Sequence, residues 1–438
     1  MLSRQENELI TRSGPGTPMG EVLRRYWMPI LLEREVAEAD GEPVKVQVLG
    51  ERLVAFRDSN GKLGLLDEFC PHRRVSLWLG RNEDCGLRCV YHGWKFDADG
   101  NCVEQMNEPG ENSFAEKVRI KHYPTLELGG IIWTYMGPSE KQPPPPRYEF
   151  TTVAATHRHV SKVIEECNWL QALEGGIDTS HAPILHRALR ASSTRPGIDP
   201  RSPFVRGGPP KLEVDTTEYG YRYAGIRQMP EGGKYVRAYH YVMPFTQLRP
   251  ASLFGAGLDA QPKDAGPGHF WVPMDDHTTM VWNFAYSLSA QGIDDEARRE
   301  YGNGNGPDHV DQQTFRAKRN MRNSWGIDRA VQKTDTYSGI EGVNTQDRAV
   351  QESMGPIIDR SQEYLGPADK AIIAMRRLLL QAVQTVESGG DPPAADESFY
   401  GIRAVERIVA DDCEWRDEIL PLMYGPVAAD TPQLVSVS

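Results

Sequence analysis

The chain of 438 residues is long enough for two or three domains, and its 39% hydrophobic and 25% charged residues are ordinary for a globular protein. Its net charge of −12 argues against nucleic-acid binding, which requires a basic surface. No apolar run approaches the roughly 20 residues that cross a bilayer, and no signal segment opens the chain. We therefore expect a cytoplasmic protein that binds neither nucleic acid nor a membrane.

The first part of the chain is predicted to hold a small β domain. Residues 1–43 are expected to be irregular and then helical, with an apolar stripe through 19–28, and to pack on the larger domain that follows. Apolar and polar residues then alternate, Asn60-Gly61 is a strong hairpin signal, and residues 131–136 form a closing strand. These patterns predict an antiparallel β domain over residues 44–142.

Four successive prolines, Pro143–Pro146, favour polyproline II and mark a domain boundary. Residues 147–438 then form the second predicted domain, and its tail from Ser388 is expected to wrap the surface. Apolar periodicity predicts the elements of this domain, namely strands at 153–164, 219–229, 235–245 and 278–288 and helices at 169–174 and 344–387.

Two loops of the first domain carry metal-binding residue types. Cys70-Pro71-His72 is followed, after sixteen intervening residues, by Cys89-Val90-Tyr91-His92. Each loop contributes one sulfur and one nitrogen, whereas a structural zinc site usually groups its cysteines in pairs. The set suits a [2Fe–2S] cluster with both Cys on one iron and both His on the other, as in Rieske clusters. A zinc knuckle or a buried Cys/His pair is the alternative.

A second group of metal-binding residue types lies in the second predicted domain. Asp178 and His181 are three residues apart and would share one face of a helix. His181 and His186 are five apart, and Pro183 can break the helix so that both imidazoles turn toward one point. Two His and a distant carboxylate form the facial triad of mononuclear non-haem Fe(II), with open positions for O2. Two core histidines with satisfied hydrogen bonds are the alternative.

The two groups together resemble one known family. Cys70 to Arg73 with Cys89 to Phe96 resembles the Rieske domain of ring-hydroxylating non-haem iron oxygenases, and the segment around Asp178, His181 and His186 resembles the same family. The resemblance implies an α+β protein: a small antiparallel β Rieske [2Fe–2S] domain plus a helix-grip catalytic domain, an antiparallel sheet flanked by helices. It also implies Fe(II), O2 as co-substrate, and NADH-derived electrons from a flavin/iron–sulfur reductase.

The resemblance also implies a third iron ligand. Residues 339–355 resemble the family helix that supplies it, and the carboxylate falls on Asp347. Its rivals are Glu352, Glu341 and Asp359. Asn168 matches an Asn that the family holds near the iron, with a structural hydrogen bond between strand and helix as the alternative.

Asp178 is expected to act beyond supporting His181, because a ligating His usually donates its other N–H to a carboxylate. In the family such an Asp also hydrogen-bonds a cluster His of the neighbouring subunit, here the partner subunit's His92. The resemblance thereby implies a homotrimer, or a hexamer of two stacked trimers.

Three stretches, 14–20, 168–171 and 352–355, resemble the branch that acts on aromatic carboxylates, typified by phthalate 4,5-dioxygenase. An anionic substrate needs a cationic anchor, best a forked guanidinium. The candidates are Arg206, Arg237 and Arg249, with Arg237 first and a surface or structural role as the alternative for each. Two departures from the branch pattern put phthalate itself in doubt: Arg74 in place of a Gly, and Ala182–Leu185 between the histidines.

The expected function is that of an oxygenase component that cis-dihydroxylates a phthalate-like aromatic carboxylate in aromatic hydrocarbon catabolism. One alternative is O-demethylation of a methoxylated aromatic acid by the same iron chemistry. An alternative of another class is a non-catalytic iron–sulfur electron-transfer protein, against which the Asp178, His181 and His186 set argues.

Overall fold

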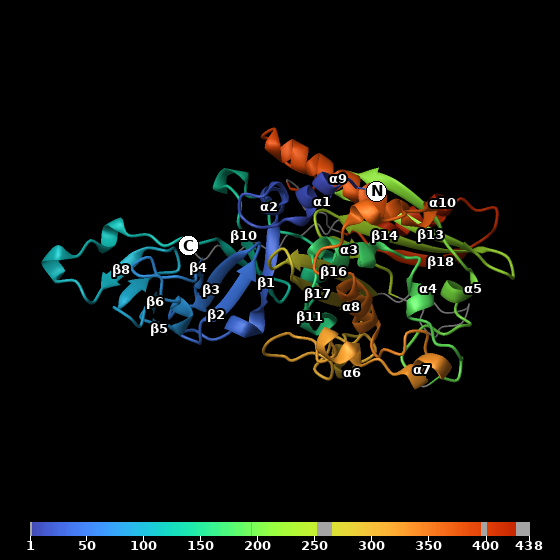
Figure 1. Ribbon diagram of the computed structural model, residues 1–438, viewed down its shortest axis with the longest axis horizontal. Helices are drawn as coiled ribbons and strands as arrows, with labels where there is room; N and C mark the ends of the chain where they lie inside the picture. Colours follow the sequence, from blue (N-terminus) through green and yellow to red (C-terminus); the bar gives the residue numbers. More distant parts are fainter. Residues whose placement is uncertain (1, 194, 252–264, 396–400, 426–438) are drawn as a thin grey trace.

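The computed structural model describes residues 2–193, 195–251, 265–395 and 401–425. The molecule is elongated, with a small β-rich part at one end and a larger sheet-and-helix part at the other (Figure 1). This arrangement confirms the predicted α+β class. In the described part of the chain, no helix combines the length and the apolar character needed to cross a membrane.

Three antiparallel sheets build the small part. The predicted hairpin at Asn60-Gly61 joins two of their strands, and Gly61 adopts a φ of +83°, which a Gly tolerates without strain. In order across each sheet, the strands are β2 (Val44–Val48), β3 (Glu51–Arg57) and β4 (Leu63–Asp67); β5 (Arg81–Glu83), β6 (Gly86–Arg88), β7 (Trp94–Phe96) and β8 (Cys102–Gln105); and β1 (Trp27–Leu32), β10 (Ile131–Tyr135) and β9 (Thr125–Leu128).

The N-terminal segment differs from the predicted helical unit. Helices α1 (Arg4–Thr11) and α2 (Pro18–Leu23) form and contact α9 (Lys370–Glu387) of the larger part. Trp27–Leu32, expected to continue the helical stripe, is instead strand β1, paired with β10. Every residue of β1 is buried, so a short apolar run cannot reveal by periodicity whether it is helix or strand. Residues 1–43 thus contribute to both parts of the molecule.

An eight-stranded antiparallel sheet forms the centre of the larger part. The strands predicted near 219–229, 235–245 and 278–288 are all present, and the one predicted at 153–164 begins later, at Arg158. In order across the sheet, the strands are β11 (Arg158–Glu165), β17 (Thr279–Ser287), β16 (Ala265–Pro273), β15 (Thr246–Leu248), β14 (Lys234–Val242), β13 (Gly220–Gln228) and β12 (Lys211–Thr217), with β18 (Val405–Val409) also paired to β14.

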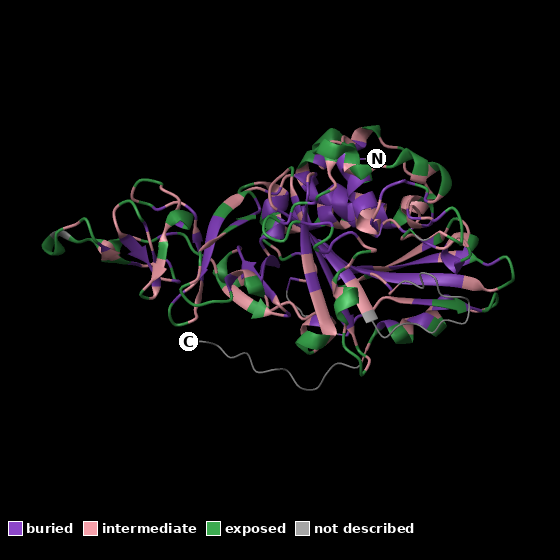
Figure 2. Cartoon of the chain, turned by 90° about the horizontal axis from the view of Figure 1, so that it is seen from below, coloured by how far each residue is buried: buried purple, intermediate pink, exposed green. Residues whose placement is uncertain are grey.

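Helices pack against this sheet, and the buried residues concentrate where they meet it (Figure 2). The predicted helical region 344–387 is present as two helices, and the predicted stripe Ile372, Met375, Leu379 and Val383 is buried. Besides α1, α2 and α9, the helices are α3 (Trp169–Ile177), α4 (Ala182–Leu185), α5 (Pro203–Arg206), α6 (Asp295–Arg298), α7 (Arg329–Thr334), α8 (Val343–Ser353) and α10 (Trp415–Met423).

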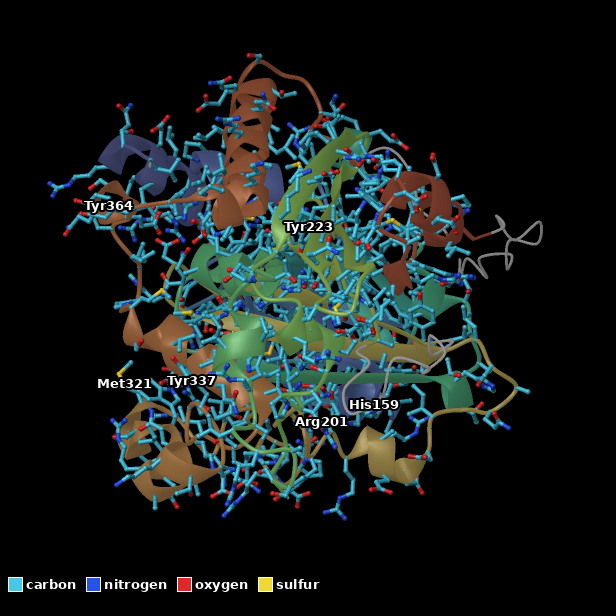
Figure 3. All side chains as sticks on the ribbon, turned by 90° about the vertical axis from the view of Figure 1, so that its right-hand side faces the viewer. His159, Arg201, Tyr223, Met321, Tyr337 and Tyr364 are labelled. Carbon is cyan, nitrogen blue, oxygen red and sulfur yellow. The ribbon has the colours of Figure 1, made fainter. Side chains whose placement is uncertain are left out.

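The core of the larger part is rich in tyrosine. Tyr223 lies in the interior and is fully buried, whereas Tyr364 lies at the periphery and is 96% exposed (Figure 3). The Tyr223 hydroxyl donates a 2.8 Å hydrogen bond to the carbonyl of Ile177, the last residue of α3. Buried tyrosines of this kind tie the ends of helices to the sheet because their hydroxyls need a partner.

The C-terminal tail does not simply wrap the surface, as the composition after Ser388 suggested. Strand β18 extends the central sheet beside β14, and α10 packs behind it. Trp415, Ile419 and Met423 of α10 are buried against the sheet residues Ala224, Val236 and Ala238. A short apolar stripe between Asp- and Pro-rich segments was too weak a signal to predict these elements.

Two glycines let α3 approach its neighbours closely. A Cβ at Gly175 would lie 1.8 Å from the Gln351 amide nitrogen of α8, and one at Gly176 would lie 2.1 Å from the Trp271 ring of β16. Glycine in a helix interior costs about 1 kcal/mol relative to alanine, so the close packing must compensate for it. The pair therefore sets the distance of α3 from both α8 and the sheet.

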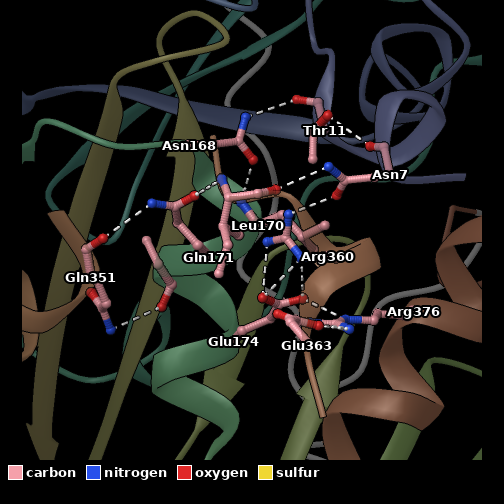
Figure 4. A network of polar contacts seen from close by, with 12 residues as sticks. Asn7, Thr11, Asn168, Leu170, Gln171, Glu174, Gln351, Arg360, Glu363 and Arg376 are labelled. Carbon is pink, nitrogen blue, oxygen red and sulfur yellow. Dashed lines mark hydrogen bonds and ion pairs between the residues drawn. The ribbon is translucent and has the colours of Figure 1, made fainter. Parts of the chain in front are cut away.

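A buried ionic network holds α3 in place (Figure 4). Glu174 accepts hydrogen bonds from Arg360 at 2.8 Å and from Arg376 at 2.7 Å, and Arg360 also donates to Asn7 of α1 at 3.0 Å. Burial disfavours a charged carboxylate, but the two guanidinium groups still hold the pKa of Glu174 below its usual value. The network links α1, α3 and α9.

We expect Arg360→Met to lower the free energy of unfolding by about 3–5 kcal/mol, because it leaves part of the buried Glu174 charge uncompensated. The midpoint of urea unfolding, followed by tryptophan fluorescence, measures this loss. Arg4→Met is the control, because the Arg4 side chain is 82% exposed in its ion pair with Asp359 and exposed pairs contribute little. Equal midpoints for the two variants would contradict the prediction.

Candidate metal centres

Two loops of the small part carry the four predicted cluster residues. Cys70 and His72 follow β4, and Cys89 and His92 lie between β6 and β7. In each loop the backbone N–H of the Cys donates to the carbonyl five residues further on, at 2.9 Å for Cys70 and 2.8 Å for Cys89. The His72 and His92 ring centroids are 4.5 Å apart. The two loops are therefore matching turns whose side chains face one another.

The donor atoms of these loops fit a [2Fe–2S] cluster. The Cys70 thiol is close enough to hydrogen-bond Cys89, and this contact lowers the pKa of the Cys89 thiol to about 6 and raises that of Cys70. The Nδ1 atom of His92 is buried and has no hydrogen-bond partner among the described residues. Such an orphaned atom is costly unless it binds something. In a Rieske cluster two Cys bind one iron and two His bind the other, so the two sulfurs must be adjacent and the two imidazoles must be adjacent.

Arg74 stands where the branch pattern has Gly, and it preserves the loop. Its φ of +60° lies in the left-handed region that Gly favours. Its guanidinium donates to the Phe69 carbonyl at 3.1 Å and lies 3.5 Å from the Asp67 carboxylate. These contacts offset the backbone strain, so the departure from the pattern leaves the turn intact.

The structure brings together His181, His186 and Asp347. Each histidine Nε2 lies 3.2 Å from the same Asp347 oxygen, Oδ1, and the three candidate ligand atoms lie within 4.8 Å of one another. That oxygen makes no hydrogen bond within the described structure, so the three atoms aim at a shared point rather than at each other. Although burial disfavours its charge, the imidazoles hold the pKa of Asp347 far below its usual range. Two imidazoles and one carboxylate fit a mononuclear iron.

The local route to this geometry differs from the predicted one. Helix α3 ends at Ile177, so Asp178 and His181 do not share a helix. Instead, the Asp178 carboxylate accepts from the Ser180 backbone at 2.7 Å and lies 3.1 Å from His181 Nδ1. Pro183 does not break a helix between the histidines but sits in the first turn of α4, which His181 and His186 flank. The turn after α3, not a helix face, therefore aligns Asp178 with His181.

Gln346 is a residue of this site that the sequence analysis missed. Its amide nitrogen donates to the Ile340 carbonyl at 2.7 Å, so its Oε1 is the acceptor for His186 Nδ1 at 2.8 Å. This assignment leaves His186 Nε2 free to face Asp347. A neutral amide beside the predicted Asp347 has no sequence signal, because its role depends on a partner 160 residues away.

The rival carboxylates are engaged elsewhere. Glu352 accepts from the Glu166 backbone and from Trp325. Glu341 accepts from Tyr301 and Arg319, and Asp359 caps a turn at Ser361. Among the predicted candidates for the third ligand, the structure therefore places only Asp347 at the two histidines.

Asn168 does not face the three candidate iron ligands. Its side chain caps α3 at Leu170 and donates to the Thr11 carbonyl at 2.9 Å (Figure 4). It also donates to the Asp276 carbonyl at 2.8 Å. It is not among the residues that line the cavity at His181, His186 and Asp347. The structural alternative, a hydrogen bond that ties the start of α3 to its neighbours, is the arrangement observed.

A cavity opens at the three candidate ligands and, with its mouth, measures about 820 Å³. Its wall includes the apolar side chains of Phe204, Trp271, Val281 and Val343, as is typical of sites for small organic molecules. Two of the predicted arginines, Arg237 and Arg249, also line it, whereas Arg206 does not. Arg206 instead forms a two-pronged ion pair with Glu231 at the protein surface.

The two predicted arginines that line the cavity have different partners. Arg237 forms a 2.8 Å ion pair with Glu406 of β18 and donates to Tyr239. Arg249 donates from Nε to His269 at 3.0 Å, and no carboxylate of the described ranges pairs with it. Burial and then the nearby Arg237 charge lower the pKa of Arg249 to about 10, so it stays charged at neutral pH. Of the two predicted arginines at the cavity, Arg249 is therefore the one without a carboxylate partner among the described residues, not the Arg237 that the sequence analysis favoured.

Comparisons with known proteins agree with this geometry. The Rieske [2Fe–2S] domain model matches residues 26–124, and the model described as LigXa C-terminal domain like matches residues 134–421. The oxygenase subunit of phthalate 4,5-dioxygenase from Pseudomonas putida is 39% identical over 95% of this chain and 94% of its own length. The oxygenase subunit of 5,5'-dehydrodivanillate O-demethylase from Sphingobium sp. is 33% identical over 90% of this chain and 83% of its own length.

The fold also matches a solved structure. The NdmA QL mutant of Pseudomonas putida CBB5 with caffeine superimposes with a TM-score of 0.59 at 19% identity, covering 91% of this chain and 100% of the other. Oxygenase components of this kind take electrons from a redox partner, and their cofactors are a Rieske cluster and a mononuclear iron. The chain belongs to the Rieske non-haem iron oxygenases, as an oxygenase alpha subunit.

Proposed function

We propose that this oxygenase cis-dihydroxylates an aromatic carboxylate, with electrons passed from NADH through a flavin/iron–sulfur reductase. Cys70, His72, Cys89 and His92 would hold the Rieske cluster, and His181, His186 and Asp347 would hold Fe(II). When bound, the two groups supply single electrons and activation of O2. The cytoplasmic location stays a prediction.

The observation that carries the proposal is an unpaired cation in an apolar cavity beside the candidate iron ligands. Arg249 lines the same cavity as His181, His186 and Asp347, and no described carboxylate neutralises it. A guanidinium in a partly dry site binds a carboxylate through two parallel hydrogen bonds. The aromatic and aliphatic side chains of the wall would contact the ring. Arg237 is less suitable as an anchor because Glu406 already balances its charge.

The relatives support two outcomes for the same iron chemistry. The relative from Pseudomonas putida is named a phthalate 4,5-dioxygenase, and the one from Sphingobium an O-demethylase. Ring dihydroxylation is our first choice, because the relative named for it is more similar and its length more completely covered. O-demethylation of a methoxylated aromatic acid is the second. A non-catalytic electron carrier is not retained, because these relatives are oxygenase subunits.

We also infer that the working unit is a cyclic trimer, alone or stacked as a hexamer. The cluster loops and the candidate iron ligands lie in different parts of the elongated chain (Figure 1). We therefore propose that the electron reaches the iron from the cluster of a neighbouring subunit, because the route within one chain would be too long. Asp178, which contacts His181 and lines the cavity, is the proposed bridge to the partner subunit's His92.

Aromatic acids supplied with NADH and a reductase should raise the O2 uptake of the purified enzyme, and mass spectrometry should show a diol. Formaldehyde release instead would assign the O-demethylase outcome. His181→Ala should abolish uptake yet keep the absorption of the cluster, because it removes one of three candidate iron ligands. A panel of mono- and dicarboxylates with no effect on uptake would sink the proposal.

Asp178→Asn should lower the rate at which the reduced cluster is reoxidised in the presence of substrate and O2 by about 10- to 100-fold. The rate is expressed per bound iron, because Asp178 also orients His181 and its loss can lower the iron content. Asp199→Asn is the control, because Asp199 pairs with Arg201 at the surface. Analytical ultracentrifugation of the wild type should show a trimer or hexamer, and a fully active monomer would rule out the bridge.

Gln346→Leu should weaken iron binding or activity by about 10- to 100-fold, since a residue that orients a metal-bound His contributes that much. Iron content and the electron paramagnetic resonance spectrum of the Fe(II)–nitric oxide adduct report the loss. Gln346→Glu restores an acceptor for His186 and should recover part of it. Gln384→Leu, on an exposed position of α9, is the control. Wild-type iron content and spectrum in Gln346→Leu would contradict the assignment.

A further inference from the structure

His269 lies in the cavity wall beside Arg249. It belongs to β16, directly opposite Asn283 of β17. Its ring is buried and stacks on Trp271 with centroids 5.2 Å apart. Neither the metal ligands nor the proposed electron route uses it.

The hydrogen bonds of His269 determine its tautomer. Arg249 Nε can only donate, so His269 Nε2, at 3.0 Å, must be the acceptor. The proton then sits on Nδ1, which donates to Asn283 Oδ1 at 2.9 Å. The Asn283 amide nitrogen donates to Ser161 at 3.3 Å, and the Asn344 amide donates to the same Asn283 oxygen at 3.4 Å, which supports this orientation. His269 is therefore a neutral acceptor for a cation.

Burial and the neighbouring Arg249 charge keep His269 neutral. Burial is the largest cause that lowers the pKa of His269, to about 3, and the Arg249 charge adds to it. Asp347 of α8 opposes the shift, and Asn283 of β17 is uncharged. The imidazole is therefore unprotonated at neutral pH, where it can accept from Arg249.

The chain contains an internal comparison for this arrangement. Arg237 and Arg249 both line the cavity, but Arg237 is held by the carboxylate of Glu406 and Arg249 by a neutral imidazole. A carboxylate partner orients a guanidinium and cancels its charge. An imidazole acceptor orients it through Nε and leaves both the charge and the two terminal nitrogens for another anion.

We infer that His269 is a positioning residue that makes Arg249 a selective anchor for the carboxylate of the substrate. This inference rests on the proposed function, because it assumes that the ligand is an aromatic carboxylate. It adds the reason for selectivity: the enzyme should favour an acid over its uncharged amide because His269 orients Arg249 without neutralising it.

Benzoate and benzamide are suitable probes, since they share shape and differ in charge. Calorimetric titration of the iron-loaded enzyme without O2 should show tighter binding of benzoate. His269→Leu and His269→Glu should each weaken benzoate binding by about 10- to 100-fold, the loss of one charge-assisted hydrogen bond, with little effect on benzamide. His269→Gln supplies a neutral acceptor and should restore much of the affinity.

In turnover of an accepted acid, the same variants should raise KM and leave kcat within about threefold, as expected for lost substrate binding alone. His240→Gln is the control, because His240 is also buried in the sheet but contacts Tyr219 and Arg403 away from the cavity. If His269→Leu does not fold, the isosteric Gln and Glu variants decide the matter.

Equal benzoate affinity of His269→Gln and His269→Glu overturns the inference. So does wild-type enzyme that binds benzoate no better than benzamide. A wild type that binds benzoate tightly but oxidises no aromatic acid defeats the proposed function instead, and it leaves the role of His269 to be judged from the binding data.

Discussion

The hydrogen bond between His186 and Gln346 is the contact on which the catalytic site depends. It joins residues 160 positions apart and fixes the proton of His186 on Nδ1. Close packing of α3 and α8, which Gly175 permits, brings Gln346 of α8 near the segment after α3 that carries His186. The hydrogen bond from Gln171 to the Gln351 carbonyl, at 3.1 Å, reinforces this packing. Two histidines from one segment and a carboxylate from another then reach a shared point.

Buried charges organise the interior around that packing, and each arginine behaves according to its partner. Arg360 and Arg376 balance Glu174 and hold α3. Arg237 balances Glu406 and donates to Tyr239, whose hydroxyl lies 2.6 Å from Thr179, the neighbour of Asp178. The C-terminal strand β18 is thereby connected to the metal loop. Arg249 differs because its partner is neutral, and this difference separates a structural cation from one available to a ligand.

The cluster loops show how a sequence departure can be absorbed. Gly93 takes a φ of +74° and a Cβ there would meet Met106, so that position requires glycine. Arg74 also takes a positive φ, yet contacts with Phe69 and Asp67 stabilise it. The Arg74 turn therefore tolerates a departure from the pattern, whereas the Gly93 turn does not, and the four candidate cluster residues stay a prediction.

The sequence by itself determined the fold class and the membership of the family, and it predicted the four candidate cluster residues and the two candidate histidine ligands, because Cys, His and Asp at short fixed spacings have few other uses. The long alternating strands and the apolar stripe of α9 could also be predicted, because burial of one face of an element gives its sequence a regular period. Only the tertiary structure decided that Trp27–Leu32 is a strand, that Asn168 caps α3 and that Gln346 orients His186. It also decided which of the two predicted cavity arginines has a carboxylate partner among the described residues. Those properties depend on a partner far away in the chain, and no local sequence pattern identifies that partner.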